Sequence, residues 1–250
     1  MRYTLYMRKY EIAVVSKNGY ARTVRIYAPK NADRAVIMHD GQNVFYDSDA
    51  TYKKSWRALD ALKSLGIKNT AVIGVDSAVT RELDYPPFPN EVTDRRLGGG
   101  AEAYMSYVDD GLIPYLDGRF AFKSYAMVGS SFGALSTLYY AARNNKRFKA
   151  YGILSAPLFV SPKAFTDFFD NSEFDADGFY EIYTGGSENV EEYPIDVSTM
   201  FVHDAFTIAD ALRKSGVKRL RLTVENEGVH DETCWRDPLK RLLTEFSKLD

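Results

Sequence analysis

Short, mostly apolar runs alternate along the chain with segments whose apolar residues recur at helical spacing. Runs of four or five such residues between turn signals are typical of strands that are buried on both faces. Apolar residues three or four positions apart, as in residues 56–65, indicate a helix instead. The pattern predicts strands at 35–38, 71–75, 125–128, 151–154, 180–183 and 220–224, and helices at 56–65, 101–116, 134–142, 200–215 and 238–249.

The first two strand-like stretches differ from the rest. Residues 9–15 and 20–28 flank Asn18-Gly19, a sequence typical of a tight hairpin turn. Strands that alternate with helices indicate parallel pairing, whereas the strands of a hairpin pair antiparallel. The sequence therefore predicts an α/β fold with a mostly parallel central sheet, an antiparallel N-terminal hairpin and helices on both faces. No linker or internal repeat divides residues 1–250, so we expect a single domain.

The composition limits the classes of function. A hydrophobic content of 45% and a charged content of 26% are typical of a globular protein in water. The net charge of −2 offers no electrostatic attraction for nucleic acid or for an anionic membrane, so we expect neither as a partner. Cys234 is the single cysteine, which excludes an internal disulfide. Charged residues interrupt any apolar run near the N-terminus, and a cytoplasmic location is the expectation.

A G-x-S-x-G pattern is the strongest chemical motif in the chain. Residues 129–133 read Gly-Ser-Ser-Phe-Gly and lie between the predicted strand 125–128 and the predicted helix 134–142. A sharp strand-to-helix turn exposes the serine hydroxyl and leaves room only for small residues two positions to either side. Glycine has no Cβ and fits that crowding. An ordinary Gly/Ser turn is the alternative, and the flanking strand and helix favour Ser131 as a nucleophile.

A serine nucleophile needs a base, which is normally a histidine. The chain contains three histidines: His39, His203 and His230. In an α/β-hydrolase the chain order is nucleophile, acid, histidine, and the histidine follows the last strand. His39 precedes the serine and His203 lies within a predicted helix, so His230 is the predicted base.

The third member of a triad is a carboxylate that orients the histidine and stabilises its protonated form. It should lie between Ser131 and His230 and follow a late strand. Glu188 is the first carboxylate after the predicted strand 180–183 and is the favoured acid. Glu191, Glu192 and Asp196 follow closely and remain open alternatives.

An oxyanion hole needs two backbone N–H groups that point at the developing negative charge. One belongs to the residue after the nucleophile, Phe132, and the other to the loop after the third strand. That loop contains Gly41, whose flexibility permits a sharp turn, and Gln42, whose amide is the predicted donor. The dipole of the helix that opens at Ser131 adds positive potential at the same place.

Four short segments carry a resemblance to a known family. Residues 39–45 are similar to its oxyanion loop, 81–87 to its R-x-x-E-Y-x-P stretch, 129–133 to its nucleophile elbow, and 230–235 to its H-N-E-x-x-W histidine segment. In this order, and over about residues 23–243, the chain resembles the esterase D-like, or "putative esterase", family of α/β-hydrolases. The resemblance implies the α/β-hydrolase fold and supports Ser131 and His230 as catalytic residues.

The chain departs from the family pattern at several positions. Asp84 stands where the family usually has Glu, Asp231 where it has Asn, and Ala134 where it often has a further Gly. Residues 155–157 read Ser-Ala-Pro, where the family often has S-P-S. This last change bears on the acyl or leaving-group pocket, so the family's substrates are not transferred to this chain.

The residues and the resemblance together predict a serine carboxylic ester hydrolase that acts through an acyl-enzyme on a small or medium ester. Members of the family cleave siderophore esters, S-formylglutathione, and feruloyl or acetyl esters of polysaccharides, and some transfer acyl groups. An acyltransferase with the same triad and a non-catalytic binding protein on the hydrolase fold are the alternatives. The sequence has no zinc-type Cys/His spacing and no phosphate-binding glycine motif, so we expect neither a metal nor a cofactor. The expected partner is a small-molecule ester, and a homo-oligomer remains open.

Two further regions bear on the substrate. The polar, Pro-rich loop 76–100 is long enough to have a function and could cover the site. Within it, Arg81 either binds an anionic group of the substrate or fixes the loop through a salt bridge, and the second role is favoured. Five phenylalanines between 159 and 174 line a pocket or belong to the core, and their near-helical spacing favours the core.

Overall fold

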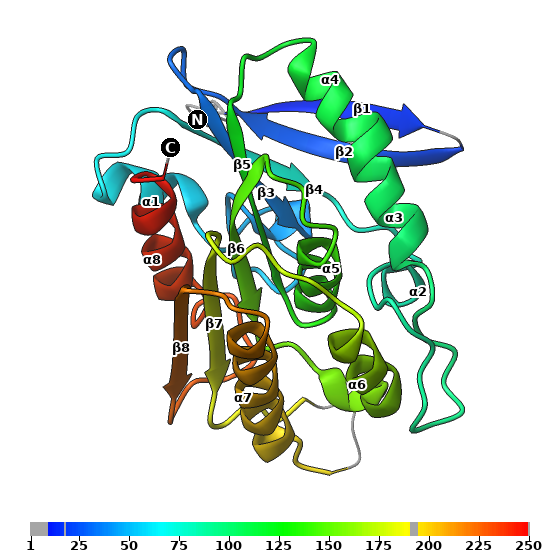
Figure 1. The fold of residues 1–250 in the computed structure, drawn as a ribbon. Coiled ribbons are helices and arrows are strands. Elements are labelled where there is room, and N and C mark those ends of the chain that lie inside the picture. Colours follow the sequence, from blue (N-terminus) through cyan, green and yellow to red (C-terminus); the bar gives the residue numbers. More distant parts are fainter. Residues whose placement is uncertain (1–9, 18, 191–194, 250) are drawn as a thin grey trace, which may run out of the picture.

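The computed structural model describes residues 10–17, 19–190 and 195–249. A twisted sheet of eight strands runs through the molecule, with helices on both of its faces (Figure 1). All neighbouring strands from β4 onward across the sheet are parallel, and β1 and β2 are antiparallel additions at one edge. The spatial order is β1 (Glu11–Lys17), β2 (Tyr20–Tyr27), β4 (Thr70–Val75), β3 (Arg34–His39), β5 (Ser124–Ser130), β6 (Phe148–Leu154), β7 (Phe179–Gly185) and β8 (Arg219–Glu225).

This architecture confirms the predicted α/β fold. The hairpin pairs Lys17 with Tyr20, so two residues form its turn, and Gly19 adopts a φ of 79° that favours glycine. Asn18, the other predicted turn residue, lies outside the described residues. Each predicted strand is present. The six parallel strands are one to three residues longer than the apolar runs that predict them, whereas the hairpin strands are shifted: β1 begins at Glu11 and continues to Lys17, and β2 ends at Tyr27, one residue before the predicted end.

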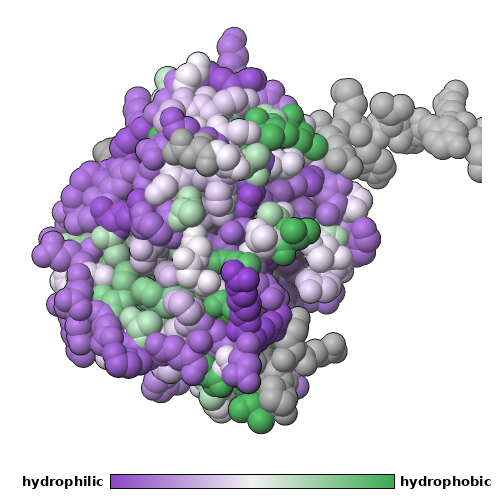
Figure 2. All heavy atoms as spheres, turned by 90° about the vertical axis from the view of Figure 1, so that its right-hand side faces the viewer, coloured by the Kyte–Doolittle hydropathy of each residue, from purple (hydrophilic) through white to green (hydrophobic). Residues whose placement is uncertain are grey.

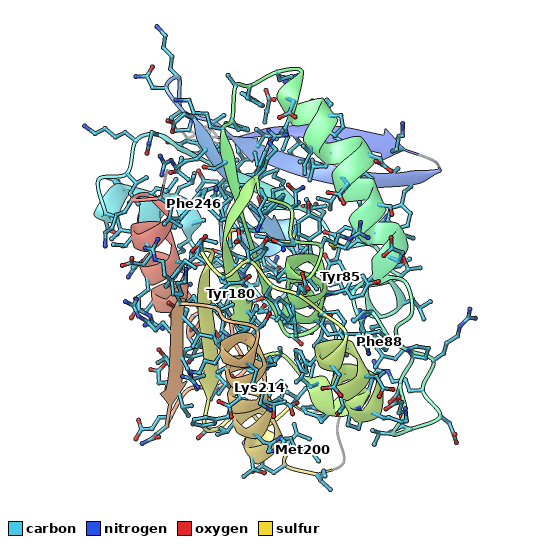
Figure 3. The ribbon with its side chains drawn as sticks, in the orientation of Figure 1. Tyr85, Phe88, Tyr180, Met200, Lys214 and Phe246 are labelled. Atoms are coloured by element: carbon cyan, nitrogen blue, oxygen red, sulfur yellow. The ribbon has the colours of Figure 1, made fainter. Side chains whose placement is uncertain are left out.

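Two hydrophobic clusters lie on the two faces of the sheet. Successive residues of β3 alternate between them, since Ile37 belongs to one cluster and Val36 and Met38 to the other. Tyr85 belongs to the first cluster and Phe246 to the second, and the two labelled side chains lie on opposite sides of the central strands in Figure 3. Burial on both faces explains why β3, β4 and β5 read as nearly continuous apolar runs.

The helices divide between the two faces. The cluster that contains Phe246 is covered by α1 (Ala58–Ser64) and α8 (Arg236–Phe246). The other cluster is covered by helices that include α5 (Phe132–Ala141) and α7 (Ser198–Lys214), as Figure 1 shows. The remaining helical segments are η1 (Gly41–Asn43), α2 (Arg81–Asp84), α3 (Ala101–Tyr107), η2 (Val108–Leu112), α4 (Ile113–Asp117), η3 (Leu158–Val160) and α6 (Pro162–Asp170).

One predicted helix is interrupted. Residues 101–116 were expected to form a continuous α-helix, but η2 between α3 and α4 is a π-helical turn. Pro114 lacks an N–H and therefore cannot donate to the carbonyl of Asp110. A wider turn ahead of the proline accommodates this missing hydrogen bond.

The phenylalanine-rich stretch belongs to the core, as its spacing predicts. Phe165 and Phe174 are buried, and the other three pack against the same cluster. Phe165 and Phe168 also contact Phe88 from the loop 76–100 with ring centroids 5.0 and 5.8 Å apart, which ties that loop to α6. Toward solvent, the face on the right of Figure 1 is mostly hydrophilic, and its apolar residues form separate patches (Figure 2).

Candidate active site

Ser131 occupies the sharp turn between β5 and α5. Its backbone angles, φ 56° and ψ −130°, fall in a region that residues with a Cβ rarely adopt. Such strain persists only where the surrounding structure imposes it, and it is characteristic of an exposed nucleophile at a strand-to-helix turn. A Cβ on Gly129 would lie 2.3 Å from the carbonyl oxygen of Gly133, so the first glycine of the motif is required for the turn to close.

Glu188 and His230 form a hydrogen-bonded pair. The Nδ1 atom of His230 lies 3.0 Å from Oε2 of Glu188, whose side chain is fully buried. Among the alternative acids, Asp196 is exposed and accepts a hydrogen bond from the N–H of Ser198. Glu191 and Glu192 lie outside the described residues. The observed geometry therefore favours Glu188 as the residue that orients His230.

The other oxygen of Glu188 has its own donors. Oε1 accepts hydrogen bonds from the backbone N–H of Gly185, at 2.6 Å, and from the hydroxyl of Ser155. The indole N–H of Trp235 in turn donates to the oxygen of Ser155 at 2.9 Å. In the sequence, Ser155 and Trp235 are distinguished only as members of the segments 155–157 and 230–235. A serine after one strand and a tryptophan five residues after the histidine reveal no contact until the sheet is assembled.

Aromatic rings hold the imidazole on two sides. Phe201 of α7 lies with its ring centroid 5.0 Å from that of His230, and Trp235 meets the imidazole edge-on at 5.1 Å. The His230 side chain is 15% exposed. The ring is thus restrained by packing as well as by Glu188, and a small part of it remains open to solvent.

The strand order brings the three predicted residues to one edge of the sheet. The N–H of Ser131 donates to the carbonyl of Leu154 at the end of β6, and the N–H of Ser155 donates to Tyr183 of β7. Glu188 follows β7, and His230 follows β8. Since β5, β6, β7 and β8 are consecutive and parallel, their carboxyl ends lie side by side, where α/β enzymes place their sites.

The predicted oxyanion loop is the short helix η1 after β3. Asp40, which precedes it, has a φ of 52°, and Gly41 packs directly on Gly74 of β4. A Cβ on Gly41 would lie 2.5 Å from the carbonyl carbon of Gly74, so Gly41 serves close backbone packing. Phe132 is the first residue of α5, where a backbone N–H has no partner within the helix. The amides of Gln42 and Phe132 remain the predicted oxyanion donors.

Arg81 forms a two-pronged ion pair with Asp40. Its Nε and Nη2 atoms lie 2.7 and 2.8 Å from the two carboxylate oxygens. Burial of Asp40 by itself favours the neutral acid, but the guanidinium outweighs it and holds the pKa of Asp40 below its ordinary value. The guanidinium also lies 5.7 Å from the ring centre of Phe132. Of the two predicted roles for Arg81, the geometry directly shows the structural one.

Two more side-chain links hold the oxyanion loop. The side chain of Gln42 both donates to and accepts from Ser77, at 2.9 and 3.1 Å. Asn43 donates to the buried carboxylate of Glu232 at 2.7 Å. Glu232 lies two residues after His230, so this contact connects the histidine loop to the oxyanion loop.

The other two histidines occupy different environments. His39 is buried beneath the oxyanion loop, with Nδ1 2.8 Å from the hydroxyl of Tyr104. Burial lowers the pKa of His39 to about 4, so the ring is neutral at pH 7. The side chain of His203 is 79% exposed on α7 and lies beside Asp204. The carboxylate beside His203 therefore belongs to α7 itself and not to the loop that directly follows β7.

Within the part of the chain that the structure describes, no cluster of three or more His, Cys, Asp or Glu side chains could hold a metal ion. Over the same residues, none of the helices is both long enough and apolar enough to span a bilayer.

Comparison with known proteins points to one family. A family model described as "Putative esterase" matches residues 16–180. Among solved structures, an IroE-like serine hydrolase from Shewanella oneidensis has a TM-score of 0.76 and 19% identity, over 96% of this chain and 82% of its own. The siderophore hydrolase EstA from Aspergillus nidulans has a TM-score of 0.74 and 15% identity, over 97% and 95%.

A third structure is similar over only part of its length. The enterobactin esterase FES from Shigella flexneri has a TM-score of 0.69 and 16% identity, over 97% of this chain and 60% of its own. These similarities show the fold. No curated protein sequence matches the chain significantly.

Proposed function

Since the chain belongs to the "Putative esterase" family, we propose that it hydrolyses small or medium carboxylic esters through an acyl-enzyme. The observation that carries the proposal is the strained Ser131 at the end of β5, on the same sheet edge as the Glu188–His230 pair. Each of these residues supplies one of the functions that ester cleavage by a serine requires.

In the proposed first half-reaction, His230 takes the proton of the Ser131 hydroxyl as the oxygen attacks the ester carbonyl. Glu188 accepts a hydrogen bond from the Nδ1–H of His230. This bond fixes the tautomer of the imidazole, and the carboxylate stabilises the imidazolium that forms. The amides of Gln42 and Phe132 stabilise the oxyanion, which is the largest single contribution in many acyl-transfer enzymes. Collapse of the intermediate releases the alcohol, which takes its proton from His230.

In the second half-reaction, a water molecule attacks the acyl-enzyme, with His230 again acting as the base. The acid product leaves and Ser131 regains its proton. The similar structures include a siderophore hydrolase and an enterobactin esterase, which motivates the inclusion of siderophore esters in a substrate screen. Simple p-nitrophenyl esters test the chemistry independently of that choice.

Ser131→Ala tests the proposal directly. We expect the variant to lose about a thousandfold or more in kcat toward p-nitrophenyl acetate, because the nucleophile is absent. A fluorophosphonate probe should label the wild-type protein at Ser131 and leave the variant unlabelled.

The matched control is Ser130→Ala, which removes the neighbouring, mostly buried hydroxyl of the same motif. Circular dichroism and the melting temperature establish that both variants fold. Turnover by Ser131→Ala comparable to that of the wild type would refute the nucleophile, and a protein that hydrolyses no ester and takes no label would refute the proposed function.

A further inference from the structure

Ser155 has an unusual environment at the end of β6. Its side chain is fully buried, and its φ of 52° lies in the left-handed region, which disfavours residues with a Cβ. Its N–H donates to the carbonyl of Tyr183 at 2.7 Å. The hydroxyl lies against Oε1 of Glu188, in contact with the indole nitrogen of Trp235.

The direction of the hydrogen bonds around Ser155 follows from chemistry. The indole nitrogen of Trp235 can only donate, so the oxygen of Ser155 must accept that bond. An ionised Glu188 can only accept, so the hydroxyl proton must point at the carboxylate. The result is a chain of donors from Trp235 through Ser155 to Glu188, and the second oxygen of Glu188 accepts from His230. Each bond in such a chain polarises the next.

We propose that Ser155 is a positioning residue that holds the Glu188 carboxylate in its ionised, His230-facing state, and that Trp235 orients Ser155. The proposal rests on the proposed function, since it assigns a role around the same pair. Ser155 and Trp235 do not touch the reacting atoms in this role and act through Glu188.

Because Glu188 is buried, its negative charge depends on the hydroxyl of Ser155 for stabilisation. A fully buried carboxylate has no water to replace a lost donor, and without Ser155 only the N–H of Gly185 remains on Oε1. A hydrogen bond to a charged group is stronger than a neutral one, and its loss should reduce kcat roughly ten- to a hundredfold. KM should change little, because the imidazolium that Glu188 stabilises forms in the transition state.

The pH profile offers a second readout. The hydrogen bond from Ser155 stabilises the negative charge of Glu188 beside Nδ1 of His230, so its removal changes the electrostatic interaction between these two side chains. The acid limb of kcat/KM should therefore move. Other titratable groups that interact electrostatically with the pair are Tyr183 of β7, with Glu188, and Glu232 on the histidine loop, with His230. All of these remain unchanged in the variants below.

The test compares Ser155→Ala, Ser155→Gly and Ser155→Cys with the wild type. Alanine removes the hydroxyl and keeps the Cβ, whereas glycine removes the hydroxyl and also relieves the strain of a positive φ. Cysteine keeps a weak donor of similar shape. Trp235→Phe retains an aromatic ring beside His230 but removes the N–H, and we expect a smaller loss of kcat in the same direction.

The control is Ser161→Ala. Ser161 is also a fully buried serine whose hydroxyl makes one hydrogen bond, in this case to the carbonyl of Pro89 at 2.7 Å. Removal of the Ser161 hydroxyl should lower stability about as much as removal of the Ser155 hydroxyl does. It should leave kcat and the acid limb of the pH profile unchanged. Ester hydrolysis by the wild-type protein, together with its fluorophosphonate label on Ser131, separately tests the proposed function.

We expect kcat to fall in both the alanine and glycine variants and to recover partly in the cysteine variant, and we expect the acid limb to move only where the donor is lost. A downfield proton resonance of the His230 Nδ1–H should shift in the same variants. Full activity in Ser155→Gly, or an unchanged acid limb in both Ser155→Ala and Ser155→Gly, would overturn the proposal even if the protein is an esterase.

Discussion

The two sides of the candidate site are held in different ways. On the acid side, Glu188, Ser155 and Trp235 are almost fully buried, and their hydrogen bonds all lead to one carboxylate. On the oxyanion side, three separate contacts hold the loop: Asp40 with Arg81, Gln42 with Ser77, and Asn43 with Glu232. The acid side is thus held by one connected series of hydrogen bonds, and the oxyanion side by several contacts that do not depend on one another.

This difference predicts different responses to mutation. On the acid side each group acts on the orientation or charge of Glu188, so the loss of one group should lower kcat. On the oxyanion side each contact holds the loop independently of the others, so the loss of one contact should lower stability more than kcat. The three predictions below test this contrast, from the largest expected effect to the smallest.

Glu188→Gln should have the largest effect. The amide can donate to Nδ1 of His230 and thereby stabilise the wrong tautomer, and it no longer stabilises the imidazolium. We expect kcat to fall by about a thousandfold or more, which corresponds to roughly 4 kcal/mol of transition-state stabilisation. Steady-state kinetics measures the rate, and thermal melting should show a change in stability that is small by comparison. A variant with near-wild-type kcat would mean that another carboxylate is the acid.

His39, beneath the oxyanion loop, should make the free energy of unfolding fall at acid pH. The unfolded chain takes up a proton near the ordinary pKa of 6.5, but burial lowers the pKa in the folded protein to about 4. Between these values the unfolded state binds more protons, so stability falls as the pH falls from about 6.5 toward 4. This single group should account for about 3 kcal/mol of the loss.

His39→Asn tests that contribution, since the amide can take over the contact of Nδ1 with Tyr104 but does not titrate. Urea unfolding at pH 7 and pH 4.5 should show a stability loss in the wild type that is clearly smaller in the variant. Equal losses in both proteins would show that His39 is not the responsible group.

Arg81→Gln should affect stability more than rate. It leaves the buried carboxylate of Asp40 without its cation, which should cost about 2 kcal/mol once partial exposure of the arginine is allowed for. Because Gln42 and Asn43 retain their own contacts, we expect kcat to fall no more than about tenfold. The double variant Asp40→Asn/Arg81→Gln removes the unpaired charge and should regain stability. A thousandfold loss of kcat in Arg81→Gln would mean that Arg81 acts on the substrate.

Much of the fold was predictable because its signals are local. Buried parallel strands such as β4 consist almost entirely of apolar residues, and tight turns require residues such as Gly19. The interrupted helix at Pro114 was missed, although a proline is a visible signal, because helical spacing continues across it. The helix α6 was read only as an aromatic-rich stretch, since its apolar residues resemble any core segment.

In the candidate site too, the features with local sequence signals could be predicted and the contacts between distant residues could not. The sharp turn at Ser131 could be predicted because the motif constrains five consecutive residues, and the place of His230 could be predicted because it follows the last strand. Glu188 could be ranked above Glu191, Glu192 and Asp196 only by its position, and the roles of Ser155 and Trp235 could not be inferred at all. Their contacts join residues that lie 33 and 80 positions apart in the chain.

The sequence by itself determined most of the elements, their order and the sharp turn at Ser131, because these depend on neighbouring residues and on the solvent preference of each side chain. Only the tertiary structure decided which carboxylate faces His230, that Arg81 pairs with Asp40, and that the buried hydroxyl of Ser155 donates to Glu188. Those contacts depend on strand order and on the burial of polar groups that must then find partners, and no local pattern encodes which partner that is.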